Sequence, residues 1–169
     1  ASALGRKVDQ LIIDVLDAGS NSNNVVHGSA ALTLAKALTV YEAFGEADIP
    51  DDGQRYFVVS PAGWADLLQI DQFSRAEYVG EGELPYSGGM TAKRWLGFLW
   101  FTHSGLSISS TTRDCHAYHS TAVGMASAQD ITTEMNYLPE KVSNLITSYF
   151  SAGAVMIDNN GAIECQITE

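Results

Sequence analysis

The chain has 169 residues, enough for one domain with a substantial core. Its 9 Lys and Arg are outnumbered by 20 Asp and Glu, and the formal net charge of -11 argues against a protein whose main surface binds nucleic acid phosphates. Two cysteines without a CxxC motif indicate neither a disulfide scaffold nor a zinc ribbon, and no apolar run is long enough to cross a membrane.

The first fifty residues predict two helices. Apolar residues recur at helical spacing across residues 3–18, and Gly19 ends this pattern. The polar tract GSNSNN that follows is typical of a loop. Thr33 is a suitable N-cap for a second amphipathic helix that we expect to continue to about Ala47.

A strand that leads directly into a helix is expected near the middle of the chain. The run RYFVV at residues 55–59 is nearly all apolar and rich in strand formers, which is typical of a strand covered on both faces. Ser60 then provides an N-cap and Pro61 a first helical position for the segment AGWADLLQI. This succession predicts a central α/β layer.

The second half of the chain is predicted to be rich in strands. Residues 71–90 contain glycines and a proline without sustained periodicity, so we expect a long mobile excursion there. After it, KRWLGFLWFTHSGLSIS and the segments from HAYHSTAVGMA to KVSNLITSYFSAGAVMI have the composition of strands. The turn DNNG and a last strand AIECQIT close the chain.

The segment DCHAYHS, residues 114–120, is the first candidate for a metal or nucleophile site. In a strand, His116 and His119 point to opposite faces, whereas a tetrahedral zinc site needs them to converge. A metal site therefore stays the alternative to ordinary strand residues with different surroundings on each face. His27 and His103 have no acid or thiol near them in sequence and are expected to be solvent or turn residues.

The second candidate is Ser60, which lies between a strand and a helix as a hydrolase nucleophile does. Its surroundings, VVSPA, lack the glycines of the GxSxG elbow, and Pro61 has no N–H to donate to an oxyanion. The tract GEGELPYSGG lacks the GK[ST] ending of a phosphate-binding loop, and the tryptophans do not alternate with basic residues as in a base-stacking surface. We therefore expect a structural or interaction protein rather than an enzyme, with no catalytic residue, metal or cofactor.

The order of these elements resembles the major capsid protein of tailed bacteriophages with the Hong Kong 97-type coat fold. The resemblance covers essentially the whole chain, and its motifs match at these positions: Arg55, Tyr56, Val58, Ser60 and Pro61 in the strand-to-helix step, Leu67 and Leu68 in the helix after it, His119, Ala122, Val123, Gly124 and Ala126 in a returning strand, and Gly153 before the last hairpin.

The resemblance implies an α+β fold in which an axial domain, a central sheet flanked by helices, joins part of a peripheral domain with a spine helix and a β-hairpin. Residues 1–169 would form a single coat-protein fragment, with residues 21–118 mainly axial and residues 1–20 and 119–169 peripheral. Members of the family carry an N-terminal arm and an extended loop ahead of the matched region. Since the chain starts without Met and within a predicted helix, we expect it to be part of a longer one.

The implied function is self-assembly through pentamers and hexamers into an icosahedral phage or prophage head that encloses DNA. The implied partners are further copies of the chain, a scaffolding protein or protease during assembly, and DNA held without sequence specificity. The implied location is the virion capsid, after synthesis in the cytoplasm of the bacterial host. The candidate capsomer contacts are Phe73, Arg75, Glu77, Tyr78 and Glu83. A nanocompartment shell of the same fold and a small α/β enzyme remain the alternatives.

Overall fold

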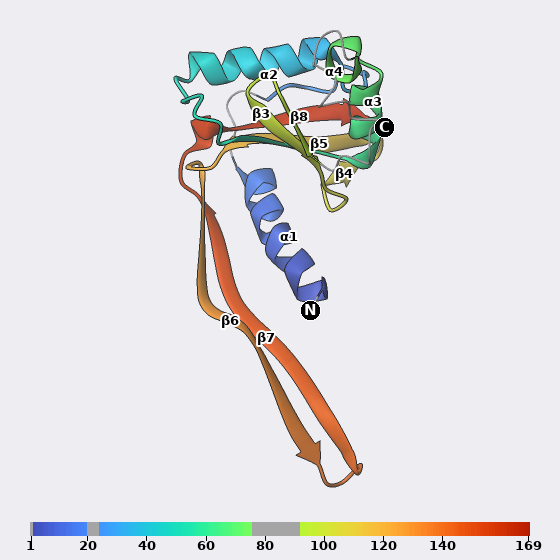
Figure 1. The fold of residues 1–169 in the computed structure, drawn as a ribbon, viewed down its shortest axis with the longest axis vertical. Helices are drawn as coiled ribbons and strands as arrows, with labels where there is room; N and C mark the ends of the chain where they lie inside the picture. Colours follow the sequence, from blue (N-terminus) through green and yellow to red (C-terminus); the bar gives the residue numbers. More distant parts are fainter. Residues whose placement is uncertain (1, 20–23, 76–91) are drawn as a thin grey trace.

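The computed structural model describes residues 2–19, 24–75 and 92–169. A head of helices and sheet carries a long β-hairpin that extends away from it (Figure 1). The helices are α1 (Ser2–Ala18), α2 (Leu34–Glu46), α3 (Pro61–Leu68), α4 (Asp71–Ser74) and a 3-10 turn, η2 (Asn159–Gly161). The strands are β1 (Arg55–Val59), β2 (Ala92–Trp95), β3 (Phe98–Thr102), β4 (Ile108–Ser109), β5 (Thr112–His119), β6 (Val123–Leu138), β7 (Ser143–Met156) and β8 (Ala162–Thr168). This combination confirms the predicted α+β class.

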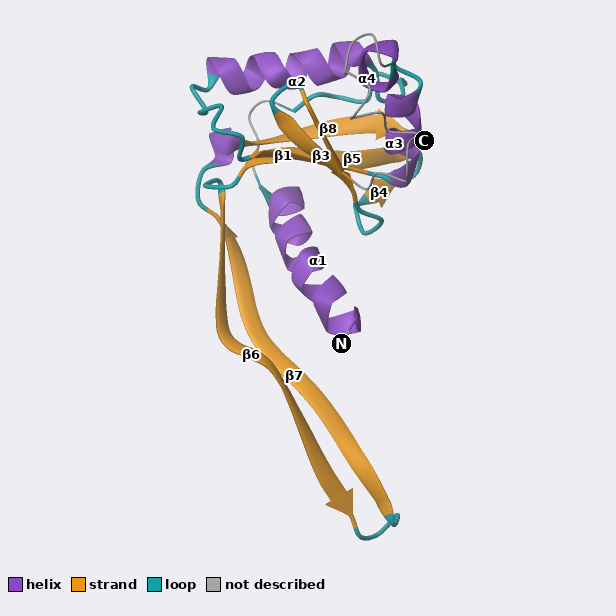
Figure 2. Ribbon diagram, in the orientation of Figure 1, coloured by secondary structure: helices purple, strands orange, loops and turns teal. Residues whose placement is uncertain are grey.

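The head is built on a six-stranded sheet in which β5 is the central pairing partner. The strand order is β2-β3-β1-β5-β4, and β8 also pairs with β5. Only β1 and β3 run parallel among these pairs, and the others are antiparallel. In Figure 2, α2 lies on one side of the sheet and α1 on the other.

An aromatic core fills the space between the sheet and α2. Phe57 of β1 stacks on Trp100 of β3 with ring centroids 3.9 Å apart, and Phe44 of α2 meets Phe98 edge-on at 5.1 Å. All four side chains are buried. Burial of large aromatic side chains is a major favourable term in folding. These four residues therefore stabilise the head, and the predicted role of aromatic residues in core packing is confirmed for them.

The predicted helices and their caps are confirmed. The Thr33 hydroxyl accepts the Lys36 backbone N–H at the start of α2. The Ser60 hydroxyl accepts the Gly63 N–H at 3.0 Å, and Pro61 occupies the first turn of α3. Among the described helices, none is both long and apolar enough to cross a membrane.

One sequence prediction needs correction in the head. Residues 71–74 are not part of an irregular excursion but form α4, because Phe73 is drawn into the core against Trp64 and Trp95. Residues 76–90 of that excursion lie outside the described residues. The run from residue 93 onward does form strands, as its composition predicts, and Leu96 and Gly97, both with positive φ, make a two-residue turn between β2 and β3.

Candidate assembly surfaces

A long exposed structure is the arm, defined as the hairpin of β6 and β7. The two strands pair antiparallel from Val123↔Met156 at the head to Leu138↔Ser143 at the tip. Most of their side chains are exposed, and the lower part of the arm extends beyond the N-terminal end of α1 (Figure 1). A two-stranded hairpin is marginally stable by itself in water. The arm therefore needs stabilising contacts beyond those that the described residues make with it.

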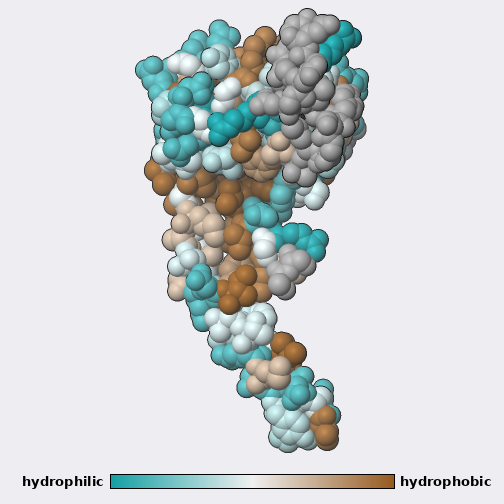
Figure 3. Space-filling model, in the orientation of Figure 1, coloured by the Kyte–Doolittle hydropathy of each residue, from teal (hydrophilic) through white to brown (hydrophobic). Residues whose placement is uncertain are grey.

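Apolar side chains cover both faces of the arm. Directly opposed residues share a face, so Met135 and Ile146 lie together on one side, whereas Leu145 and Tyr149 lie on the other. Met135 is 68% and Ile146 61% exposed. In Figure 3, apolar residues gather where the head meets the arm and recur down its length. Exposed apolar patches of this kind are typical of protein–protein contacts. The large apolar residues exposed along this segment are Met125, Ile131, Met135, Tyr137, Leu138, Val142, Leu145, Ile146, Tyr149, Val155 and Ile157.

The base of the arm packs against α1. Leu16 of α1 is buried together with Ala122 and Ala162, and Val123 and Met156 from the two arm strands lie against this cluster. The helix therefore fixes the direction in which the arm leaves the head.

A buried polar contact attaches the C-terminal end of α1 to the sheet. His116 of β5, 1% exposed, donates from Nε2 to Asp17 Oδ1 at 2.7 Å, and the Ser107 hydroxyl donates to the other carboxylate oxygen. Burial raises the pKa of the Asp17 carboxyl, but these two hydrogen bonds outweigh burial, and its pKa lies below the usual value. Asp17 is therefore an anionic anchor that sets where α1 meets the sheet.

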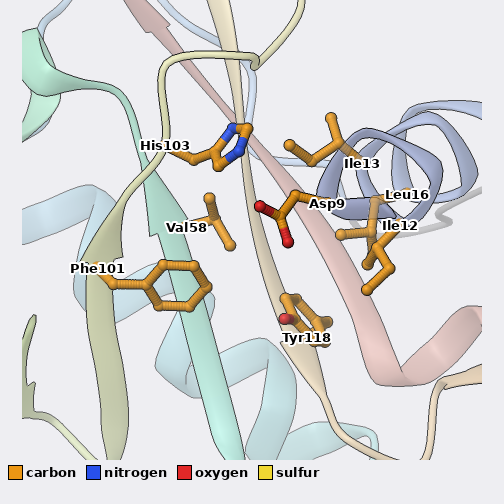
Figure 4. Close-up of a pocket in the computed structure, with 8 residues that line it drawn as sticks. All are labelled: Asp9, Ile12, Ile13, Leu16, Val58, Phe101, His103 and Tyr118. Atoms are coloured by element: carbon orange, nitrogen blue, oxygen red, sulfur yellow. The ribbon is translucent and has the colours of Figure 1, made fainter. Parts of the chain in front are cut away.

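An apolar cavity of about 280 Å³ lies beside this anchor, between α1 and the sheet. Its α1 wall contains Ile12, Ile13 and Leu16, which face Val58 of β1 and Tyr118 of β5 (Figure 4). The remaining lining residues are Asp9, Phe101 and His103. Apolar side chains dominate this lining, so the cavity offers packing space rather than a set of convergent catalytic groups.

The structure separates the two histidines of DCHAYHS, as the strand pattern predicts. His116 reaches Asp17, whereas His119 donates to Asp52 Oδ1 at 3.1 Å on the other side of the sheet. The hydrogen bond from His119 lowers the pKa of the Asp52 carboxyl. Across residues 2–19, 24–75 and 92–169, no cluster of three or more His, Cys, Asp or Glu could hold a metal ion. The sequence did not indicate these acid partners, because Asp17 lies 99 residues from His116 and Asp52 lies 67 residues from His119.

The remaining chemical candidates have structural roles. Ser60 is buried and caps α3. His27 and His103 accept backbone N–H groups two residues ahead and are thus turn residues.

The two cysteines are an unexpected pair. Cys115 and Cys165 lie directly opposite each other on β5 and β8, both free and buried. Burial raises the pKa of each thiol to about 12. The fifty residues between them in sequence gave no signal of this contact.

The sequence profile of a family described as phage capsid protein matches residues 1–169. The chain belongs to this family. No curated protein sequence gives a significant match.

Solved structures show that this capsid protein has the Hong Kong 97-type coat fold. The Mycobacterium phage Che8 structure superposes with a TM-score of 0.74 at 20% identity over 97% of this chain and 59% of that one. The capsid of Cyanophage P-SCSP1u gives 0.71 at 16% identity over 99% and 63%. The SrpI encapsulin of Synechococcus elongatus PCC 7942 gives 0.59 at 9% identity over 91% and 56%. The capsid protein chain described here thus spans about three fifths of the first two relatives.

Of the five predicted capsomer contacts, the structure describes Phe73 and Arg75. Phe73 is 0% exposed, because it packs between Trp64 and Trp95 within its own chain, whereas the Arg75 side chain is 61% exposed and pairs with Asp71 at 2.9 Å. Glu77, Tyr78 and Glu83 lie outside the described residues. Their role in contacts between copies stays a prediction.

The division into axial and peripheral parts also stays a prediction. Strand pairing in the head nevertheless argues for a different assignment of β8. β8, placed in the peripheral segment 119–169, pairs with β5 along seven residue pairs in the central sheet. By strand pairing it belongs with the head rather than with the arm.

Proposed function

We propose that this chain is the shell-building part of a major capsid protein, which assembles through pentamers and hexamers into an icosahedral phage head around DNA. The observation that carries the proposal is the arm: a member of a phage capsid family presents a long two-stranded hairpin whose apolar side chains its own described residues leave uncovered. Copies of the same chain would cover it in a closed shell, where one surface meets a different surface of the next copy.

The charge of the chain is compatible with a container for nucleic acid. A net charge of -11 disfavours tight adherence to phosphate, so packaged DNA would be held by the closed wall and not by sequence-specific contacts. The proposal places the protein in the virion after synthesis in the host cytoplasm, with a scaffolding protein or protease as an assembly partner.

A nanocompartment shell is the second candidate, and the fold likeness to the SrpI encapsulin supports it. The contents of purified particles separate the two. A phage head made in infected or induced cells contains DNA, whereas a nanocompartment contains protein cargo.

The arm provides the test of the proposal. Replacing the opposed residues by Met135→Glu with Ile146→Glu in the full-length protein puts two charges where a neighbouring copy would bury apolar surface. Because every 1.4 kcal/mol changes an equilibrium tenfold, and unpaired buried charge costs several kcal/mol, we expect the assembled fraction to fall by at least about a hundredfold.

The matched control is Met135→Leu with Ile146→Val, which keeps the same face apolar and should assemble normally. Sedimentation velocity measures the assembled fraction, and circular dichroism checks that the head remains folded. Normal assembly of the glutamate variant would contradict a role for the arm in the shell.

A further inference from the structure

Two strands of the head sheet carry cysteines that face each other. Cys115 of β5 and Cys165 of β8 are directly opposed in the antiparallel register, so their side chains lie on the same face of the sheet. Both are 0% exposed, and the 169 residues contain no other cysteine. Each thiol therefore has one possible disulfide partner within these residues.

The backbone sets the distance between the two cysteines. Val25 donates its N–H to the Glu164 carbonyl at 2.9 Å and accepts the Gln166 N–H at 2.8 Å, so these two residues of β8 point their backbone groups away from β5. The backbone groups of Cys165, which lies between them, thus point toward Cys115, and the two cysteines form a hydrogen-bonded pair. The Cα atoms of such a pair are about 5.5 Å apart, within the range of about 4.4–6.8 Å that a disulfide needs.

The position of the pair relative to the arm gives such a bond a mechanical effect. β5 leads into β6 and β7 leads into β8, so both arm strands continue into the two strands that carry the cysteines (Figure 1). A ring closed between Cys115 and Cys165 contains the whole arm. A force on the arm that pulls β8 away from β5 is opposed by non-covalent contacts in the reduced protein and by a covalent bond in the oxidised protein.

We propose that Cys115 and Cys165 form a cross-strand disulfide when the protein leaves a reducing environment. A reducing cytoplasm keeps the two thiols reduced, whereas oxidising surroundings favour the disulfide. The bond itself is independent of the proposed shell function. Its role, which is to fasten the base of the arm after assembly, rests on that function.

The oxidant is a low-molecular-weight disulfide such as oxidised glutathione. The thiolate of one cysteine attacks a glutathione sulfur, forms a mixed disulfide and releases one glutathione thiolate. The thiolate of the other cysteine then attacks the cysteine sulfur of the mixed disulfide and releases the second glutathione thiolate. The protein loses two electrons and two protons, and both pass to the two molecules of reduced glutathione.

Burial makes this reaction slow. Burial raises the pKa of both thiols to about 12, and the Ser60 N–H at Cys115 and the charge of Lys36 at Cys165 offset it only in part. Oxidation therefore proceeds through transient opening of β8, the last strand along the chain. The same closure protects the finished disulfide from reductants, so the bond should persist once it has formed.

Full-length protein purified with its thiols reduced tests the pairing. The protein is incubated with oxidised glutathione in mild urea, below the unfolding transition, and its peptides are analysed by mass spectrometry without reduction. We expect the peptides that contain Cys115 and Cys165 to be linked to each other as the main product. Because the bond closes a ring of about fifty residues, the Tm should rise by roughly 5–15 °C above that of the reduced protein.

Two variants provide matched controls. Cys115→Ala keeps a small apolar side chain at the buried position and cannot form the bond, so the same treatment should leave its Tm unchanged. Cys165→Ala with Ile163→Cys places a cysteine on the same face of β8 but diagonal to Cys115, where Cα atoms are about 7–8 Å apart and thus too distant for a disulfide. This variant should form no internal disulfide. Circular dichroism checks that each variant is folded.

The outcomes separate the disulfide from the shell function. Thiols that end only as mixed disulfides with glutathione, or equal bond formation in the diagonal variant, would overturn the pairing. Treated shells of the wild type should dissociate at a higher temperature than untreated ones, and shells of Cys115→Ala should not. Shells in which both wild-type cysteines stay free would overturn the disulfide and leave the shell function intact. A disulfide in a protein that forms neither rings nor shells would confirm the bond and overturn its role in a shell.

Discussion

Removal of the Asp17 carboxylate should loosen the attachment of α1 to the sheet. In Asp17→Ala, the buried His116 loses its hydrogen bond of 2.7 Å, and Ser107 loses its acceptor. Among the described residues, His116 Nδ1 already has no hydrogen-bond partner, so the substitution would leave both ring nitrogens unpaired in a side chain that is 1% exposed. Its effect should therefore exceed that of a surface substitution.

The magnitude follows from the groups left unpaired. A hydrogen bond to a charged group contributes about 1.5–3 kcal/mol, and an unsatisfied buried polar group costs about 1–3 kcal/mol. Because these two figures describe overlapping effects, we expect the free energy of unfolding to fall by about 3 kcal/mol. For a chain of this size, each kcal/mol corresponds to roughly 2–4 °C, so the Tm should fall by about 6–12 °C.

The assay is thermal and urea unfolding of the wild type, Asp17→Ala and the control Asp14→Ala. Asp14 is an exposed carboxylate on the same helix that accepts a hydrogen bond of 2.9 Å from the half-buried Gln10 side chain, and its replacement should change stability by no more than about 0.5 kcal/mol. If Asp17→Ala is as stable as Asp14→Ala, the carboxylate does not anchor α1 and the reasoning is refuted.

Three further predictions concern the interior. Phe73→Ala should reduce the free energy of unfolding by about 3–5 kcal/mol in chemical denaturation, because Phe73 is buried. The control Arg75→Ala removes an exposed side chain and should change the free energy of unfolding by less than about 0.5 kcal/mol. Equal effects of the two substitutions would contradict the burial of Phe73. The lowered pKa of Asp17 contributes stability that is complete above its unfolded value of 3.8 and is lost as the pH falls below that value through the folded pKa. Below about pH 4 the wild type should therefore lose more stability than Asp17→Asn, and parallel curves would count against the anchor. With pKa values raised to about 12, Cys115 and Cys165 should react with a thiol reagent at pH 8 only after unfolding, so rapid labelling of the native protein would disprove their burial.

Local sequence rules predicted most of the head, because its elements begin and end with local signals. Thr33, Ser60 and Pro61 mark helix starts through their own hydrogen-bonding and backbone chemistry, and the structure places the helices there. The alternation of DCHAYHS correctly separated its two histidines. α4 was missed, since one turn of helix leaves no periodic signal and is held by the tertiary burial of Phe73.

The candidate assembly surface was harder to predict, because exposure is a property of the fold. Strand composition indicated β6 and β7, but not that neither face would be covered by the head. Two runs of similar length joined by Pro139, Glu140 and Lys141 could have indicated a long hairpin. The contacts of Asp17 with His116 and of Cys115 with Cys165 are long-range, so no local pattern encodes them.

The most direct measurement of the shell function is negative-stain electron microscopy, with mass determination, of the full-length protein expressed alone. Uniform hollow shells, or free rings of five or six copies, are the predicted result. A monomer that forms no rings at any salt or protein concentration would contradict self-assembly as the function of this chain.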